Sequence, residues 1–594
     1  MVMKVSARQI SILKIIVTFV ALWIINDIAG SYFMRWDLTD DQRYTLKEST
    51  IALLEDDEKF QDRMIVRVYL EGEFPAEWKK LQKEVRIKLE EYRAYAGDKF
   101  EFEFIDPFAG SDKENEALLQ ELYQKGLKPM LIPAAGEGDV GGKTIVPGAI
   151  IKYPGQEDVP VMFFPANRSI MNFTRDYIRD QVQSSITNME FNLTSGIKRS
   201  ITKKKPRVAF LQGHGELEEE DVQYALSYAR EYYNIEFTDL LKEGTNEENI
   251  RALRTYRALI IAQPKKPFTE KEKFLIDQFI MKGGRVMWMI DPVDPHKDSL
   301  QYYGRTLGLS RELNLGDQFF KYGIRVNNDI VVDERVGPIG IPSQDGRMMI
   351  FPWYFFPLAD NIRNDHPITN NMDRVKLEYA SSIDTLSNDP DIRKTVLLQS
   401  SERSTNFRPP VRIFYDWVLG EAKPNFEGPN SKPHQIMAVL LEGTFESLYK
   451  NRITPEFRDT LEKSDYVFKE ESSPNKMIVV ADGDLIRNDL DSISRPGSVR
   501  PIPIERSYYS IFNQQLQGLR FGNKEFFLNS LDYLLGDESL IASRNKMSMR
   551  LLDMNKVKQQ KRYWQFINVT LPVAIIVLFA IGQGLFRRYK YTRT

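Results

Sequence analysis

The segment RVAFLQGHGE, from Arg207 to Glu216, decides the fold because it joins a buried strand, a tight turn and the start of a helix. RVAFL is an apolar run of strand length, and Gly213 and Gly215 let the backbone turn sharply after it. Similar apolar runs occur downstream at Ala258 to Ala262, Arg285 to Ile290 and Lys476 to Ala481. Helical segments separate the earlier runs, so the pattern predicts an open, doubly wound α/β sheet.

The helix before Arg285 has recognisable ends. Thr269 followed three residues later by Glu272 forms a capping box, and Gly283 with Gly284 ends the helical pattern. The next strand leads directly to Asp291. Well-defined helix ends between apolar runs support the predicted alternation of strands and helices.

Upstream, residues 30–202 predict a juxtamembrane segment and a separate α/β domain. Met64 to Leu70 alternates like a strand, Pro75 to Tyr95 has helical spacing, and Phe100 to Ile105 alternates strictly. Strand, helix and strand form a βαβ unit with a parallel pair of strands. A hairpin and a closing helix come next, at Met130 to Pro133, Ile145 to Tyr153 and Asp176 to Ile197.

Two apolar segments flank the larger part of the chain. Residues 10–29 include the uninterrupted run IIVTFVALWII and have the length that a bilayer core requires. Residues 564–586 contain Pro572 but no charge, and basic pairs bracket them. We therefore expect two transmembrane helices, with a cleaved signal peptide as the alternative for the first. The flanking charges do not decide the orientation.

These features predict the layout of the whole chain. Residues 1–9 form a short tail, 10–29 a transmembrane helix, and 30–202 the juxtamembrane segment and first α/β domain. Residues 203–540 form the second α/β domain, with an irregular insertion at about 295–430. Residues 541–563 are a basic juxtamembrane segment, 564–586 the second transmembrane helix, and 587–594 a basic C-terminal tail.

Composition excludes several classes of function. Lys and Arg number 81 against 83 Asp and Glu, so the formal charge of −2 argues against a nucleic-acid partner. The absence of cysteine excludes disulfides, thiolate metal sites and a cysteine nucleophile. The four histidines, His214, His296, His366 and His434, lack ligand spacing, so we expect no metal and no cofactor.

The segment EGDVGGKT, from Glu137 to Thr144, resembles a phosphate-binding P-loop. The P-loop pattern requires glycine where Glu137 stands, and a helix after the loop whose N-terminus points at the phosphates. Here a strand-like run comes after the loop, so we interpret the segment as a hairpin turn. We therefore expect the chain to carry no ATPase of its own.

Polar residues at the ends of the predicted strands are the ligand-binding candidates, because ligands of open α/β sheets lie beyond the carboxyl ends of the strands. They are His214, Glu216, Asp291, Asp482 and Asp484. A hydrolase would use His214 as a base. Alternatively, His214 and Glu216 satisfy backbone groups of the loop or cap the helix, and the aspartates end their strands and cap the next elements. We predict no catalytic residue, since no nucleophile elbow is present.

Several segments, taken together, resemble one family. Those in the first domain are DLTDDQRYTL (Asp37 to Leu46), VYLEGEFP (Val68 to Pro75) and FIDP (Phe104 to Pro107). Those in the second are RVAFLQGHGE, GGRVMWMIDP (Gly283 to Pro292), KYGIRVNNDIVVDE (Lys321 to Glu334), VVADGDLIRND (Val479 to Asp489) and FFLNSLDYLLGDESLIASRNK (Phe526 to Lys546). The chain is similar to the gliding-motility-associated ABC-transporter auxiliary family (GldG-like) of Bacteroidetes, also described as a substrate-binding component.

The resemblance implies a two-pass protein of the bacterial inner membrane, with a periplasmic domain and both termini in the cytoplasm. It implies a separate ABC permease and a separate ABC ATPase as partners, besides the lipid bilayer; a homodimer stays open. It also implies that the second domain has a class I amidotransferase-like fold, shared with an intraflagellar-transport subunit. The family has no established catalytic residues, so none is transferred to this chain.

Three hypotheses for function result. The first is a noncatalytic accessory subunit of an ABC-type transporter linked to gliding motility. The second is a glycan- or peptide-binding module that uses the crevice around His214 and Asp291. The third is a hydrolase in which His214 acts with Glu216 or Asp482.

Overall fold

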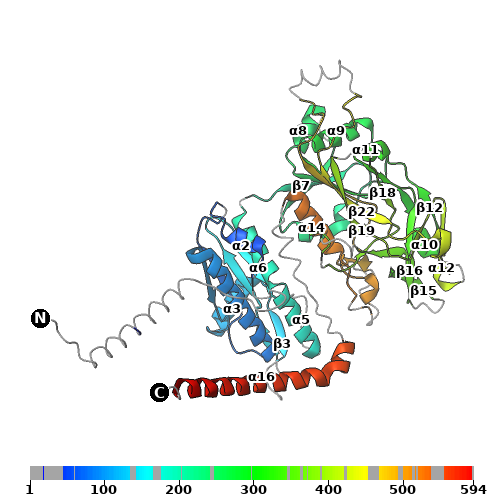
Figure 1. Cartoon of the computed structure of the whole chain (residues 1–594). Helices are drawn as coiled ribbons and strands as arrows, with labels where there is room; N and C mark the ends of the chain where they lie inside the picture. The colour runs from blue at the N-terminus through cyan, green and yellow to red at the C-terminus, as the bar shows by residue number, and fades with distance from the viewer. Residues whose placement is uncertain are drawn as a thin grey trace. The chain divides into compact units, whose positions relative to one another are not determined.

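A computed structural model of the chain shows mixed α/β architecture (Figure 1). It describes residues 18, 45–58, 60–133, 142–164, 175–202, 204–240, 246–295, 297–343, 348–360, 366–370, 372–387, 391–420, 424–452, 467–491, 499–511, 516, 519–536 and 554–591. Two compact units, residues 1–546 and 547–594, make up the chain.

The N-terminal half of the larger unit contains a four-stranded sheet in the order β2-β1-β5-β6. Its strands are β1 (Met64–Val68), β2 (Phe100–Phe104), β5 (Gly148–Lys152) and β6 (Val159–Met162). β1 and β2 pair in parallel and α3 (Ala76–Ala96) connects them, which confirms the predicted βαβ unit. Apolar residues of α3 pack on the sheet because they recur with helical spacing.

Two details of this region differ from the prediction. β3 (Met130–Pro133) pairs with β4 (Gly142–Ile145), so the hairpin exists, but β5 leaves it and pairs with β1 instead. The predicted closing helix is two helices, α5 (Arg175–Thr187) and α6 (Met189–Ile201). The turn of the P-loop-like segment, residues 134–141, lies outside the described residues.

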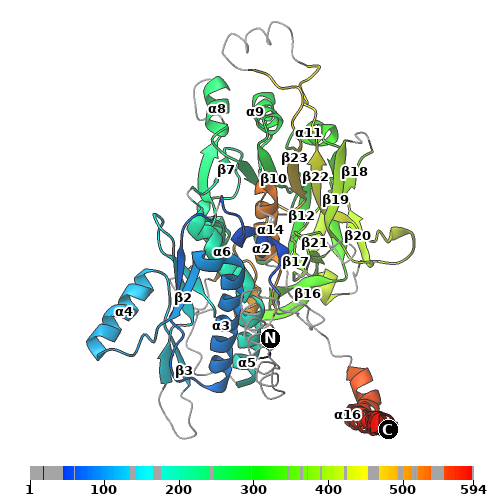
Figure 2. The ribbon, with the colours of Figure 1, turned by 60° about the vertical axis from the view of Figure 1, so that its left-hand side comes forward.

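The C-terminal half contains a seven-stranded sheet in the order β19-β22-β23-β10-β9-β7-β8 (Figure 2). Five strands are parallel: β8 (Asn234–Asp239), β7 (Arg207–Gln212), β9 (Ala258–Ala262), β10 (Arg285–Met289) and β23 (Asn475–Val480). β22 (Ile436–Gly443) runs antiparallel to β23, and β19 (Ile392–Gln399) completes the edge. The RVAFL run is thus an interior strand, as its uninterrupted apolar character predicts.

Helices cover both faces of this sheet, which confirms the doubly wound arrangement. α7 (Gln223–Ala229) and α14 (Asn523–Leu535) pack on one face. α8 (Asn246–Leu253), α9 (Glu270–Met281) and α11 (Gly316–Lys321) pack on the other. Alternate residues of each strand enter the two cores, because successive side chains of a strand point to opposite faces. The candidate site residues lie in the loops at the carboxyl ends of the parallel strands.

The region predicted as irregular, about 295–430, is more ordered than its composition indicates. It has its own apolar core, formed around Trp353 and Phe355 of β16 (Met348–Ala359). Its strands β12 (Arg305–Ser310) and β21 (Val411–Phe414) pair with each other, and β19 joins the main sheet. Pairing partners far apart in sequence explain why local pattern did not reveal these strands.

Among the described residues, no helix is both long enough and apolar enough to cross a membrane. The predicted span 564–586 lies within α16 (Met554–Tyr591). The predicted span 10–29 lies outside the described residues except for Thr18. This finding contradicts the prediction of two transmembrane helices. It also contradicts the expected two-pass placement in an inner membrane with a periplasmic domain.

Candidate functional site

The structure brings the predicted site residues to one edge of the seven-stranded sheet, where they form two clusters. His214 and Glu216 follow β7, Asp291 follows β10, and Asp482 and Asp484 follow β23. This edge is shared because parallel strands present their carboxyl ends together. The loop after β9 contacts both clusters.

The first cluster surrounds the His214 ring, which is 4% exposed. Its Nδ1 lies 3.2 Å from Oε1 of Glu216, and its Nε2 lies 3.1 Å from Oε2 of Glu272. The ring stacks on Phe268, with centroids 3.8 Å apart. Both ring nitrogens therefore face carboxylates.

Backbone contacts fix the same cluster. Oε2 of Glu216 accepts the backbone N–H of His214 at 2.7 Å. The backbone N–H groups of Lys265 and Lys266 donate to the carbonyl of His214 at 2.7 and 2.9 Å. Oε2 of Glu272 also accepts the N–H and hydroxyl of Thr269, so the capping box of α9 holds the histidine in place. The alternative interpretation of His214 and Glu216, as groups that satisfy the loop backbone, agrees with this geometry.

The pKa of His214 lies above its ordinary value. Burial alone lowers this pKa, but the hydrogen bonds to Glu216 and Glu272 outweigh burial and favour the imidazolium. The pKa of Glu272 is lowered: burial raises it, while Thr269 and His214 lower it more. Glu216 and Glu272 thus hold both ring nitrogens of His214 and favour its protonated form.

The second cluster contains the three aspartates. Asp291, 7% exposed, accepts the backbone N–H of Gly483 at 2.6 Å and the side-chain amide of Gln263 at 2.9 Å. Asp482, fully buried, accepts the backbone N–H groups of Asp484 at 2.7 Å and of Glu378 at 2.6 Å. These backbone hydrogen bonds hold the loop after β23 against the end of β10.

Burial and mutual repulsion shift the proton affinity of these carboxylates. Burial raises the pKa of Asp291 to about 6, and the charge of Asp484 contributes in the same direction. The pKa of Asp482 is raised as well, first by burial and then by the charges of Asp291 and Asp484. Arg487 lies 3.5 Å from Asp484 and offsets part of its charge.

Gln263 is a member of this cluster that the sequence did not indicate. It is 6% exposed, has a positive φ of 56°, and its Oε1 has no hydrogen-bond partner among the described residues. A non-glycine residue in the left-handed region is strained, and such residues concentrate at functional sites. Its position after the apolar run ALIIA was the one sequence signal, but glutamine there has no distinctive chemistry.

The space at this edge is small. A Cβ at Gly483 would lie 2.7 Å from Oδ2 of Asp291, so only glycine lets the loop close on the cluster. The cavity beside Asp484 has a volume of about 20 Å³, enough for about one water molecule. Within the described ranges, no three acidic or histidine side chains are arranged to hold a metal ion. The cluster is therefore closed as it stands.

The structure is that of an α/β protein with a doubly wound seven-stranded sheet, whose carboxyl edge carries buried ionisable side chains. Residues 205–530 match the family described as an ABC-type uncharacterized transport system, and the chain belongs to this family. Membership implies association with components of a transport system. Residues 40–152 match a domain of unknown function.

Individual relatives are distant. An uncharacterized protein of Borreliella burgdorferi is 23% identical over 290 residues, which is 49% of this chain and 55% of that protein. The chain thus spans about half the length of this curated relative. Among solved structures, the N-terminal domain of mmIFT52 aligns over 55% of this chain and 96% of its own, with 12% identity and a TM-score of 0.30.

Proposed function

We propose that the chain is a noncatalytic accessory subunit of an ABC-type transport system, working with a separate permease and a separate ATPase. The family match over residues 205–530 carries the proposal. The contacts of His214 support the proposal. This residue is the one best suited to act as a base, but its two ring nitrogens contact Glu216 and Glu272 instead. The finer assignment to gliding motility rests on the sequence resemblance alone.

Co-purification tests this proposal. We expect the tagged full chain, extracted in mild detergent, to bring an ABC ATPase and an ABC permease with it, identified by mass spectrometry. The untagged chain, expressed in the same cells at the same level, is the control for nonspecific recovery. Recovery of neither component above that control would contradict the proposal.

A glycan- or peptide-binding module at the carboxyl edge is the second candidate. The unpartnered Oε1 of Gln263, buried beside Asp291, favours it, because buried polar atoms normally have a partner. The cavity on the Asp484 side of this edge admits about one water molecule, so a larger ligand would have to lie over the edge. Replacing Asp291 by asparagine separates this candidate from the first.

A further inference from the structure

The four-stranded sheet of the N-terminal half has two edges, and the edge at β6 is closed. Pro160 of β6 has no N–H to donate, and its carbonyl accepts Nη2 of Arg199 at 3.0 Å. The carbonyl of Met162 accepts Nδ2 of Asn192 at 3.3 Å. Proline and covering groups are common means by which proteins keep a sheet edge from pairing with another strand. These contacts leave β6 few main-chain groups for such a strand.

The opposite edge, β2, lacks this protection. Its five residues, FEFEF, contain no proline and pair with β1 in continuous register. The N–H of Ile105 donates to the carbonyl of Val68 in β1 at 2.8 Å. Since successive residues of a strand direct their main-chain groups to alternate sides, those of Phe102 and Phe104 point away from β1. Among the described strands, β1 alone pairs with β2, so the outward donors and acceptors are open to a further strand.

One face of β2 carries carboxylates. Glu101 pairs with Arg63, just before β1, and Glu103 pairs with Arg67 of β1, so the charges alternate in sign from one strand to the next. The two glutamate side chains are 46% and 48% exposed. Each carboxylate has two acceptor oxygens, and the arginines approach from the β1 side. A lysine or arginine on an added strand would continue the alternation of charge.

The other face of this edge is apolar and lies under α3. The guanidinium of Arg86 lies 3.8 Å from the ring centroid of Phe104, and that of Arg93 lies 5.3 Å from the ring centroid of Phe102. The two rings are 6.2 Å apart and are only partly buried. Because residues directly opposite each other in a sheet share a face, apolar side chains of an added strand would lie beside these rings.

A second copy of the chain fits this edge poorly. The outward groups of Phe102 and Phe104 would have to bond with the same groups of the second β2. That pairing places the glutamates of one copy opposite those of the other, and like charges directly opposite each other are destabilising. A partner with cations at those positions is therefore favoured.

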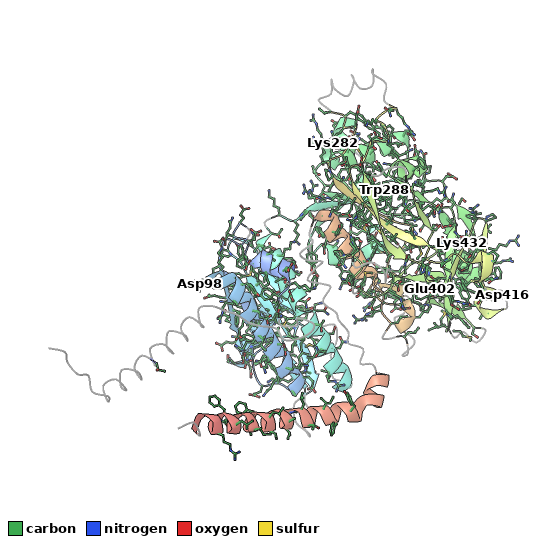
Figure 3. All side chains as sticks on the ribbon, in the orientation of Figure 1. Asp98, Lys282, Trp288, Glu402, Asp416 and Lys432 are labelled. Atoms are coloured by element: carbon green, nitrogen blue, oxygen red, sulfur yellow. The ribbon has the colours of Figure 1, made fainter. Side chains whose placement is uncertain are left out.

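We propose that β2 is a docking edge to which an extended segment of a partner protein adds a fifth strand. The segment has lysine or arginine opposite Glu101 and Glu103, and apolar residues at the positions between them. Main-chain hydrogen bonds give affinity, and the alternating side chains give specificity. Five residues of added strand cover about 16 Å, the length of β2 at about 3.3 Å per residue. Asp98, labelled in Figure 3, adds another exposed carboxylate just before the start of this strand.

A defined peptide tests this edge without reference to any transport partner. We expect a fluorescein-labelled heptapeptide of alternating valine and lysine to bind the full chain in fluorescence anisotropy. The same peptide methylated at every backbone nitrogen keeps its charge but loses its main-chain donors, so it should not bind. A heptapeptide of alternating valine and glutamate should bind at least about tenfold more weakly, because its charges oppose Glu101 and Glu103. No binding of the first peptide, or equal binding of the first and either of the others, would overturn the proposal.

Two variants at one position separate main-chain pairing from side-chain contact. Phe104→Pro removes an outward N–H without breaking a bond to β1, whereas Phe104→Ala removes the ring and keeps that N–H. The proline variant should bind the valine–lysine peptide at least about fivefold more weakly than the alanine variant, the size expected for a lost hydrogen bond. Equal affinities would contradict strand addition. A dimer of the unmodified chain in analytical ultracentrifugation that Phe104→Pro abolishes would identify a second copy as the occupant instead.

Hydrogen exchange on the unmodified chain gives a readout that does not depend on whether the variants fold. The amides of Phe102 and Phe104 should exchange quickly in the free chain, because they face outward. A saturating amount of the valine–lysine peptide should slow them several-fold, and residues 159–162 at the closed edge should not change. Equal slowing at both edges, or at neither, would contradict docking at β2.

Discussion

Replacing His214 by alanine should lower the free energy of unfolding by about 3–5 kcal/mol, the range expected when one partner of a buried ion pair is removed. The variant would leave the carboxylates of Glu216 and Glu272 facing each other without a cation. The side chain of Glu216 is 1% exposed, so water cannot replace the lost contacts. The stacking of the ring on Phe268 would be lost as well.

Urea unfolding at neutral pH measures this effect, and a double variant identifies its cause. If unpaired charge dominates, His214→Ala combined with Glu216→Gln should be more stable than His214→Ala alone, because the amide removes one buried charge. A loss below about 0.5 kcal/mol in the single variant, the size typical of surface substitutions, would show that the bridge is not structural.

The same bridge should make stability depend on pH in a defined direction. The pKa of His214 in the folded chain is raised above its ordinary 6.5, so the folded state binds the proton more tightly. The resulting stabilisation is complete below 6.5 and is lost as pH rises through the folded pKa. Thermal unfolding of the unmodified chain should show this loss, and the His214→Ala variant should not.

Replacing Asp291 by asparagine should have the opposite effect and stabilise the chain. The pKa of Asp291 is raised by burial to about 6, so the folded state at pH 7.5 contains an unfavourable charge that asparagine removes. Asparagine keeps the acceptor for the N–H of Gly483, and its amide can donate to the unpartnered Oε1 of Gln263 after that group rotates. We expect a gain of about 1–3 kcal/mol in the free energy of unfolding.

The pH dependence follows from the same shift. Because the folded pKa of Asp291 lies above the ordinary value of 3.8, the folded state binds more protons between about pH 4 and 6. Its contribution to stability therefore falls as pH rises through that window. Asp291→Asn should remove this fall, whereas Asp294→Asn, a half-buried residue paired with Arg311, should not. A destabilised Asp291→Asn chain at pH 7.5 would contradict this assignment of the buried charge.

This variant also separates the two candidate functions. If the carboxyl edge binds a ligand, Asp291→Asn should be stable but lose function, because the charge that recognises the ligand is gone. If the chain acts only through association, the variant should co-purify with its partners and retain function. Proteins often keep strained residues or unbalanced charges at functional sites, although these features lower stability.

The sequence predicted the parts of the structure that depend on local pattern. The apolar runs at Arg207, Ala258 and Arg285 became the interior strands, because a strand buried on both faces needs continuous apolar residues. The placement of His214 and Asp291 at one edge followed from parallel topology alone. Thr269 and Glu272 were identified as a capping box, and the structure confirms it.

The sequence did not predict the parts that depend on tertiary contact. Glu272 was identified as a cap, but its bond to His214 forms only when α9 lies against the loop after β7. Gln263 has no distinguishing neighbours in sequence, and its positive φ is imposed by the packing of the β9 loop. β19 pairs with a strand about 40 residues away, so its place in the main sheet could not be read from its own residues. The apolar segments at both ends were predicted as membrane spans, and among the described residues no such helix is found.

ATP turnover tests the central claim most directly, because an accessory subunit should change a partner's activity without having that activity itself. Phosphate release would be measured for the full chain alone, for the purified ATPase–permease pair, and for the two combined. We predict no turnover by the chain alone and a changed rate when it joins the pair, with all components eluting together. Hydrolysis by the chain itself, or an unchanged rate with separate elution, would contradict the role of an accessory subunit.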